Sequence, residues 1–494
     1  MDCIIGIDIG TTNIKSVIIS TNGELINEFD QSHELHSPQT GYKEQDPEKI
    51  LTSVIAIIKR SLESLRADHV AKAISFSSAM HSIMAIDKNG NALTPLITWA
   101  DTRAHKIAHD LKFTEQGKRI YEKTGTPVHA MSPLCKIAWI KDQQPHIFQN
   151  AAKFISAKEY IFFRLFNQFI IDHSIASAMG LFNIEKLDWD PEALEFAGIT
   201  TSQLSAPVPI TTSVTGLNEI YQTQIPLSNE TLFIIGGSDG CMANLGSFAV
   251  NDNEAAITIG TSGAVRRLSS QKMIDDQQQS FQYRLDENVY VKGGAINNGG
   301  IALQWFLNQF YSDIIGEKDI AQTLKEITKV PAGAEGLVFL PYVFGERSPV
   351  WDASATGTFS GISSHHTKTH FLRAVIEGIC FSLLQVMKVV EKNGPPIVSV
   401  FASGGFIQSE TWVQILADIL QKKITINTGV DASALGAAFV ALKKLGFIDQ
   451  WTDLKNYFSG SKEYLPNEDV AAVYLQNYIV YSTLYPALQK GKNN

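Results

Sequence analysis

The sequence has few cysteines and gives them no spacing typical of a metal site or a disulfide framework. Only four occur in 494 residues, namely Cys3, Cys135, Cys241 and Cys380. Thiolate metal sites use short paired spacings, and small disulfide-bonded folds need more cysteines than this. A cysteine-based metal site and a disulfide scaffold are therefore excluded, and a reducing compartment is expected.

Long apolar runs and an excess of positive charge are also missing. No hydrophobic stretch approaches the roughly 20 residues of a membrane helix. The strand-like run after Met1 lacks the pattern of a signal peptide, so we expect a cytoplasmic protein without a membrane partner. The 41 Lys and Arg against 50 Asp and Glu give a net charge of -9, which argues against nucleic acid as a partner. The 44% hydrophobic residues are typical of a globular protein.

What the sequence contains is a β-rich start that is echoed about halfway along the chain. Residues 4–30 predict three short strands separated by the turn formers at 10–13 and 22–23. Residues 254–267 repeat this design around Gly-Thr-Ser-Gly. Helical and strand-like segments alternate elsewhere, which indicates an α/β fold. We expect two large domains of related design, residues 1–250 and 251–494.

Both hairpin tips have residues that suit phosphate binding. In the first, small and hydroxyl residues between Asp8 and Lys15 let backbone amides approach phosphate oxygens, while Asp8 suits a magnesium ion. The alternative is an ordinary tight turn in which Gly10 and Asn13 adopt unusual dihedrals. A second tip of the same kind, Gly260 to Gly263, favours phosphate binding. Two such hairpins in two related domains could hold one nucleotide from both sides.

Two glycine pairs precede segments with helical periodicity. Gly299-Gly300 stands before IALQW and Gly404-Gly405 before FIQSETW. Glycines allow close approach of a ligand, and free amides at a helix start favour anions. The alternative is a plain strand-to-helix connector. The Walker pattern is absent, so a P-loop kinase is not expected.

Two further segments carry polar residues beside strand ends. Asp239 follows a strand-like run and two glycines, where a carboxylate could accept the proton of an attacking hydroxyl. Its alternative role is the N-cap of the next helix. The segments 77–81 and 99–103 offer donors, acceptors and apolar faces for a polyol, although a lone His or Trp is more often a core residue.

Two long motifs resemble the signatures of the FGGY carbohydrate kinases. Residues 131–143 (MSPLCKIAWIKDQ) match the first signature, and residues 357–377 match the second from Gly357 to Glu377. The resemblance runs from Ile4 to about Gly446. It implies two actin-like, ribonuclease H-like ATPase domains of the sugar kinase, hexokinase and Hsp70 superfamily, with a cleft between them.

Within the family the sequence is most similar to the gluconate kinases. The segments that carry this similarity are SSAMHS, ITWADTR, KTGTPVHAMSPL, ASAMG, INNGG and GERSPVW. The xylulose kinases are similar at Met80 and His81 but differ around Trp99 and GERSP. The implied activity is transfer of the γ-phosphoryl group of ATP to the terminal hydroxyl of D-gluconate, with Mg²⁺ as a second cofactor.

The resemblance also implies roles at matching positions. Asp239 is the expected catalytic base and also contacts the sugar, and Asp8 is the expected magnesium residue. The other expected sugar contacts are Met80, His81 and Met131. The expected nucleotide and phosphate contacts are Thr11, Thr12, Asn13, Lys15, Gly260, Thr261, Gly300, Gln304, Gly404, Gly405 and Ser409. At the place of Ser409 the glycerol kinases carry Asn, which puts the contact to the adenine end in doubt.

A sugar acid requires positive charge or well-aimed donors at its carboxylate. The candidates in this sequence are His81, Arg103, His129 and Lys158. A xylulose, ribulose or other polyol kinase is the closest alternative. An actin-like assembly protein or ATP-driven chaperone would hydrolyse ATP without a sugar. A homodimer is expected by analogy alone.

Overall fold

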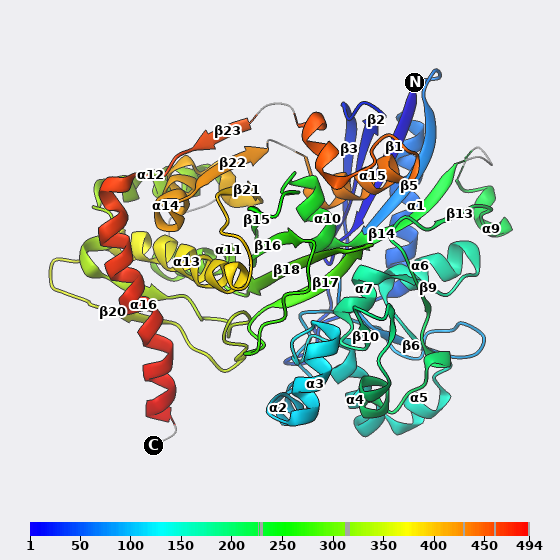
Figure 1. The fold of residues 1–494 in the computed structure, drawn as a ribbon, viewed down its shortest axis with the longest axis horizontal. Coiled ribbons are helices and arrows are strands. Elements are labelled where there is room, and N and C mark those ends of the chain that lie inside the picture. Colours follow the sequence, from blue (N-terminus) through cyan, green and yellow to red (C-terminus); the bar gives the residue numbers. More distant parts are fainter. Residues whose placement is uncertain (226, 228–230, 312–316, 428–429, 459–460, 493–494) are drawn as a thin grey trace. The chain divides into compact units, whose positions relative to one another are not determined.

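The computed structural model describes residues 1–225, 227, 231–311, 317–427, 430–458 and 461–492 (Figure 1). The chain forms two compact units. The first contains Met1–Val250, Ser269–Val291 and Gly429–Phe458, and the second contains Asn251–Leu268, Lys292–Thr428 and Ser459–Asn494. The segments Ser269–Val291 and Gly429–Phe458 thus belong to the first unit, although they follow residue 250 in the sequence. Among the described residues no helix is both long and apolar enough to span a membrane.

The first unit is built on a six-stranded sheet that contains the predicted N-terminal strands. Its order is β13 (Ser213–Val214), β14 (Leu232–Ser238), β5 (Val70–Ser78), β1 (Asp2–Ile9), β2 (Asn13–Ser20) and β3 (Leu25–Ser32). The pairs β1–β2 and β2–β3 are antiparallel, which confirms the two hairpins. The pairs β1–β5 and β5–β14 are parallel.

Helices cover this sheet and are drawn partly from the far end of the sequence. The helix α1 (Pro47–Glu63) starts at Asp46, whose carboxylate accepts from the amides of Glu48 and Lys49. The helix α15 (Ala432–Lys444) packs on β1 (Figure 1). A Cβ on Gly6 would stand 2.0 Å from the carbonyl oxygen of Ala434, so glycine is required for this close packing.

The remaining elements of the first unit are short. Its other helices are α2 (His105–Lys112), α3 (Glu115–Thr124), α4 (Pro133–Gln143), α5 (Pro145–Asn150), α6 (Ala157–Phe166), α7 (His173–Ala178), α8 (Pro191–Ala197), α9 (Glu219–Gln222) and α10 (Asp239–Gly246). Its other strands are β4 (Glu44–Gln45), β6 (Met84–Ile86), β7 (Leu96–Ile97), β8 (Lys153–Ile155), β9 (Ile170–Asp172), β10 (Phe182–Asn183), β11 (Asp188–Trp189), β12 (Ala206–Val208) and β17 (Phe281–Asp286).

The second unit repeats the design with its own sheet. Strands lie side by side in the order β18 (Val289–Ile296), β16 (Gly263–Ser269), β15 (Glu254–Ile259), β21 (Ser399–Ser403), β22 (Lys423–Asn427) and β23 (Ser461–Tyr464). The antiparallel pair β15–β16 confirms the predicted second hairpin. The remaining elements are α11 (Gly300–Phe310), α12 (Glu317–Glu326), α13 (Lys368–Glu391), α14 (Glu410–Leu420), α16 (Ala471–Lys492), β19 (Val338–Leu340) and β20 (Thr358–Ser360).

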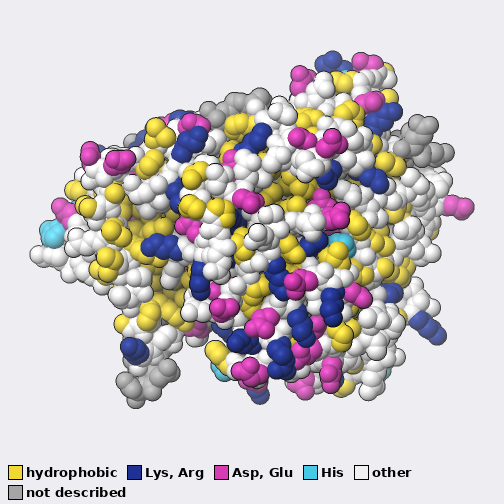
Figure 2. All heavy atoms as spheres, in the orientation of Figure 1, with side chains coloured by type: hydrophobic (Ala, Val, Ile, Leu, Met, Phe, Trp, Pro, Cys, Tyr) yellow, Lys and Arg dark blue, Asp and Glu magenta, His cyan; other side chains and the backbone are white. Residues whose placement is uncertain are grey.

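The surface carries charges of both signs close together. On the face shown in Figure 2, Lys and Arg side chains alternate with Asp and Glu, and no continuous basic area is visible on that face. Both units are α/β, each built around one main sheet.

Candidate active site

Three parallel strands of the first unit bring polar residues to the same level. In the register of the sheet, Asp8 of β1 lies beside Ser77 of β5, and Ser77 lies beside Gly237 of β14. The Ser77 hydroxyl donates to Oδ1 of Asp8 at 2.6 Å. Because parallel strands end at one edge, Asp8 is brought to the level of the segment that leads to Asp239.

Asp239 is the first residue of α10, directly after β14. The N-cap of this helix is Ser238, so the alternative in which Asp239 caps the helix is wrong. Oδ1 of Asp239 accepts from the amide of Gly240 at 2.7 Å.

Asp431 belongs to the same group of residues, although the sequence analysis did not identify it. It is the N-cap of α15 and accepts from the amide of Ala434. Its Oδ2 also forms an ion pair with Lys15 at 2.8 Å. An Asp directly before an apolar helical run is an N-cap signal, but that signal alone does not say which site the helix faces.

The carboxylates of this group repel one another. Asp8 is buried, and burial raises its pKa well above the usual range; the negative charges of Asp431 and Asp239 raise it further. A divalent cation would relieve this repulsion. Mg²⁺ usually takes one or two carboxylates together with water and phosphate oxygens. Within the described ranges no three His, Cys, Asp or Glu residues form a group that could hold a metal ion.

The first hairpin tip presents polar side chains without unusual dihedrals. The amide of Gly10 donates to the carbonyl of Asn13 at 3.0 Å, and neither residue has a positive φ. The alternative that these two residues supply unusual dihedrals is therefore wrong. The amide group of Asn13 donates to the Thr12 hydroxyl at 3.3 Å, and the Thr11 hydroxyl accepts from the indole of Trp99 at 2.9 Å.

One of the predicted sugar residues, Met80, lies next to this tip. Met80, Trp99 and Thr11 line one small cavity together with Ile9, Gly10, Gln45, Ile50, Ala79, Ser82, Leu96, Thr98 and Ala157. His81 has a φ of 65°, and its Nδ1 donates to the carbonyl of Ala178 at 2.7 Å. The first hairpin tip thus shares one small cavity with Met80 and Trp99.

A buried lysine holds the backbone behind these residues. Nζ of Lys136, in the first signature motif, donates to the carbonyls of His81 and Thr98, each at 2.7 Å. Burial lowers the pKa of Lys136 to about 7. Sequence reasoning missed this role, because a lysine inside a helix pattern is normally read as exposed.

Two of the four candidates for the substrate carboxylate are held in buried ion pairs. Arg103 pairs with Asp101 and Glu44, and its side chain is only 4% exposed. Lys158 pairs with Asp172 at 2.7 Å and is buried. His81 and His129 remain candidates, although His81 also has partners: its Nδ1 donates to the carbonyl of Ala178 and its Nε2 lies 3.4 Å from the Tyr283 hydroxyl. Nδ1 of His129 accepts from the amide of Met131, and the Met131 side chain is buried.

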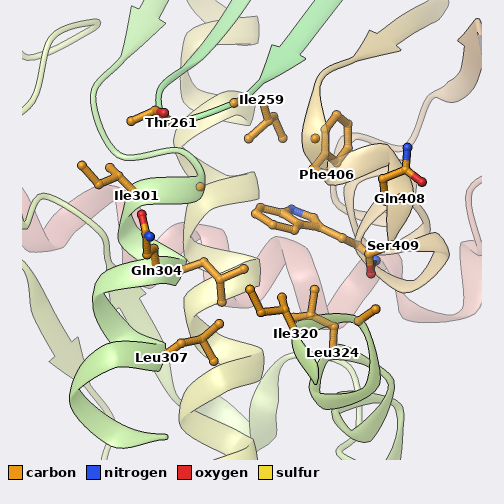
Figure 3. A pocket seen from close by; sticks show the side chains of 16 residues that line it. Ile259, Thr261, Ile301, Gln304, Leu307, Ile320, Leu324, Phe406, Gln408 and Ser409 are labelled. Atoms are coloured by element: carbon orange, nitrogen blue, oxygen red, sulfur yellow. Dashed lines mark hydrogen bonds between the residues drawn. The ribbon is translucent and has the colours of Figure 1, made fainter. Parts of the chain in front are cut away.

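The second unit contains a cavity of about 500 Å³ next to the second hairpin (Figure 3). Figure 3 shows Gln304 and Leu307 of α11 on one side of the cavity and Ile320 and Leu324 of α12 beside them. Its remaining lining residues are Ile259, Gly260, Thr261, Gly300, Ile301, Leu303, Ala321, Gly405, Phe406, Gln408, Ser409 and Trp412. A largely apolar cavity of this size with a few polar groups fits a nucleoside.

Six of the seven nucleotide residues expected in this unit line the cavity, namely Gly260, Thr261, Gly300, Gln304, Gly405 and Ser409. Gly404 is not among the lining residues. It has a φ of 102°, and a Cβ there would stand 2.3 Å from the carbonyl oxygen of Ile259. The positive φ and the close carbonyl of Ile259 thus explain why this position is a glycine.

Two expectations about the glycine-led helices are wrong. The first amides of α11 are not free, because Gly300 donates to the carbonyl of Gly260 at 2.7 Å and Ile301 to that of Thr261 at 3.1 Å. The other helix, α14, starts at Glu410 and not directly after the glycines, and the Ser409 hydroxyl caps it by accepting from Trp412.

Both halves of the chain match models of one protein family. Residues 3–246 match the model of the N-terminal domain of the FGGY family of carbohydrate kinases, and residues 255–445 match its C-terminal domain. The chain is 40% identical to a gluconokinase of Bacillus subtilis over 477 residues, 95% of this chain and 93% of that protein.

Two solved structures from Lactobacillus acidophilus are similar over the whole chain. A ligand-bound xylulose kinase has a TM-score of 0.95 at 34% identity and covers 100% of both chains. A gluconate kinase has a TM-score of 0.94 at 34% identity and covers 99% of this chain and 98% of its own.

Proposed function

Since the chain belongs to the FGGY family of carbohydrate kinases and is an ATP-dependent sugar phosphotransferase, we propose that its acceptor is D-gluconate and its product 6-phospho-D-gluconate. The observation that carries the choice of acceptor is the 40% identity to a gluconokinase across 95% of the chain. The division into domains 1–250 and 251–494 remains part of this proposal.

In the proposed reaction Asp239 accepts the proton of the terminal hydroxyl of the acceptor. The hydroxyl oxygen attacks the γ-phosphorus of ATP, and the bond from that phosphorus to the bridging oxygen of ADP breaks. The transition state is loose, so the contribution of the protein is alignment and charge neutralisation more than strong proton abstraction. The position of Asp239 beside the carboxyl ends of β1 and β5 supports this role.

Mg²⁺ is the second proposed cofactor, and it would neutralise charge on the phosphates that it binds. Asp8 is the residue proposed to hold it or its waters, supported by its position among acidic neighbours. Thr11, Thr12, Asn13 and Lys15 are proposed to meet phosphate oxygens. The proposed nucleotide contacts of the second unit are Gly260, Thr261, Gly300, Gln304, Gly404, Gly405 and Ser409.

The acceptor is proposed to bind at Met80, His81, Met131 and Asp239. Met80 lines the small cavity beside Trp99, where its apolar side chain can cover C–H surface of a sugar. Arg103 and Lys158 are held in buried ion pairs, and His129, which is half-buried, is the proposed partner of the carboxylate, with His81 as the second candidate.

The test is ADP release from Mg-ATP with D-gluconate, D-xylulose, L-ribulose, glycerol or no acceptor. We expect strong dependence on D-gluconate. We expect Asp239→Asn to lower kcat by about 10²-fold to 10⁴-fold with little change in the KM for ATP. Asp188→Asn, at an exposed Asp in β11 of the same unit, is the control and should keep normal turnover.

The alternative acceptor is xylulose, favoured by the similarity to the xylulose kinase of Lactobacillus acidophilus. A preference for D-xylulose would identify D-xylulose as the acceptor and would leave the assignment as a carbohydrate kinase intact. Near-normal turnover of Asp239→Asn would remove Asp239 from the mechanism. ADP release without any acceptor would contradict the proposed acceptor site.

A further inference from the structure

One peptide unit directly before Asp239 is held by side chains at both of its polar groups. The carbonyl of Gly237 accepts from Nζ of Lys158 at 2.9 Å. The amide of Ser238 donates to the hydroxyl of Ser174 at 2.7 Å. These two groups belong to the same planar peptide, so its orientation is fixed from both sides.

The two side chains are joined to each other by Asp172. Its Oδ1 accepts from the Ser174 hydroxyl at 2.6 Å, and its Oδ2 pairs with Lys158 at 2.7 Å. All three residues are at most 1% exposed. Lys158, Asp172 and Ser174 therefore surround the Gly237–Ser238 peptide with three hydrogen bonds and one ion pair, an arrangement called the peptide clamp.

The backbone just before this peptide departs from regular strand geometry. The pairing of β14 with β5 shifts register between Ile234 and Gly237, and Gly236 has a φ of 61°. A Cβ on Gly236 would stand 1.8 Å from the carbonyl oxygen of Phe76. A bulge redirects the chain that follows it, so the direction of the next residues has to be set by other contacts.

We infer that the peptide clamp sets the direction of the Asp239 carboxylate, and that Lys158, Asp172 and Ser174 are positioning residues for phosphoryl transfer. The inference rests on the proposed role of Asp239 as the base. Rotation of the Gly237–Ser238 peptide would swing the start of α10 and with it Asp239. Errors of about 1 Å in the placement of a catalytic group cost about 100-fold in rate.

The chemistry of the clamp supports a geometric role. Burial lowers the pKa of Lys158, and the charge of Asp172 opposes this shift. A buried ion pair contributes little net stability compared with apolar residues of similar volume. The pair instead fixes the orientation of the Gly237–Ser238 peptide. Lys158 also donates a hydrogen bond to the Gly237 carbonyl, and Asp172 also accepts one from the Ser174 hydroxyl.

The first test uses Ser174→Ala, because this residue is the neutral member and its removal leaves the ion pair intact. We expect kcat with the preferred acceptor to fall about 10-fold to 100-fold, with the KM for ATP unchanged within about twofold. The matched control is Ser61→Ala in α1, a buried serine that hydrogen-bonds Ser16 at 2.8 Å. The control should keep its kcat.

A double-mutant cycle separates positioning from a general loss of structure. If the clamp acts through Asp239, Ser174→Ala should reduce the remaining activity of Asp239→Asn by less than about twofold. The same fold-loss in both backgrounds would overturn the inference. Unchanged kcat in folded Ser174→Ala would overturn it as well.

A second variant tests the charged members together. The double substitution Lys158→Met with Asp172→Leu removes both charges, so neither is left buried and unpaired. We expect a cooperative thermal transition with a kcat reduced as in Ser174→Ala. Loss of folding in both variants would show that these residues serve the fold itself and would also contradict the inference.

These outcomes are distinct from failure of the proposed function. If Asp239→Asn keeps full activity, Asp239 is not the base and the proposed mechanism fails. If Asp239→Asn is impaired while both clamp variants are folded and fully active, only the inference about the clamp fails. A different preferred acceptor affects neither result, since each variant is measured with the acceptor that the wild-type protein prefers.

Discussion

Lys15 and Asp431 form an ion pair at 2.8 Å across 416 residues of sequence. The pair connects β2, next to the tip of the first hairpin, to the N-cap of α15. It thereby brings Asp431 near Asp8, in addition to Asp239. It also gives Lys15 a partner in this structure, so contact with a phosphate would require Lys15 to share or exchange that partner.

Asp8→Asn should weaken the response to magnesium. The neutral amide cannot offset the charge of Mg²⁺ as a carboxylate does, so we expect the Mg²⁺ concentration for half-maximal rate to rise about 10-fold or more. The measurement is a Mg²⁺ titration at saturating ATP and acceptor. Asp2→Asn, at the other end of β1, should titrate like the wild-type protein. Identical titrations for Asp8→Asn and wild type would contradict the magnesium role.

Lys136 should make stability depend on pH. Its pKa falls from 10.5 to about 7 on folding, because burial removes water from the ammonium group. Between these values the unfolded chain binds more protons than the folded one, so stability rises as pH increases above about 7. The slope approaches about 1.4 kcal/mol per pH unit for a full proton difference.

The comparison is urea unfolding of the wild-type protein and Lys136→Met from about pH 7 to about pH 9. We expect the wild-type protein to gain stability relative to the variant as pH rises, because the variant lacks this proton. Lys141→Met, at an exposed lysine in the same helix, should follow the wild-type curve. Parallel curves for Lys136→Met and wild type would argue against a lowered pKa.

His129→Gln should affect the sugar acid more than a neutral sugar. Loss of a hydrogen bond to a charged group costs about 1.5 to 3 kcal/mol, so we expect the KM for D-gluconate to rise about 10-fold or more. The KM for D-xylulose should change by less than about twofold, since xylulose has no carboxylate. His109→Gln, on the exposed side of α2, is the control. Equal effects on both sugars would assign the carboxylate to another residue.

Ala321→Trp should interfere with nucleotide binding alone. Ala321 lines the cavity of the second unit, and a larger side chain would occupy space that we assign to the nucleoside. We expect the KM for ATP to rise about 10-fold or more, with the KM for the acceptor unchanged. Gln322→Trp changes the next residue of α12, which does not line the cavity. If both variants bind ATP normally, the nucleoside lies elsewhere.

The sequence by itself determined the local elements and the family. Clusters of Ile and Val between turn formers predicted β1 to β3 and the pair β15–β16, and the register confirms them. Strand periodicity and turn chemistry are local properties, so a single sequence is enough to reveal them. The two signature motifs in the segments 131–143 and 357–377 identified the carbohydrate kinase family for the same reason, since each lies within one stretch of chain.

The tertiary structure decided which residues share a site and which are already engaged. Asp431 enters the group around Asp8 because α15 packs on β1, which no local pattern indicates. Arg103 and Lys158 look available in sequence, yet the structure pairs them with acids and buries them. Burial and long-range pairing depend on how distant elements pack, and a charge that is costly to bury becomes acceptable only where packing supplies its partner.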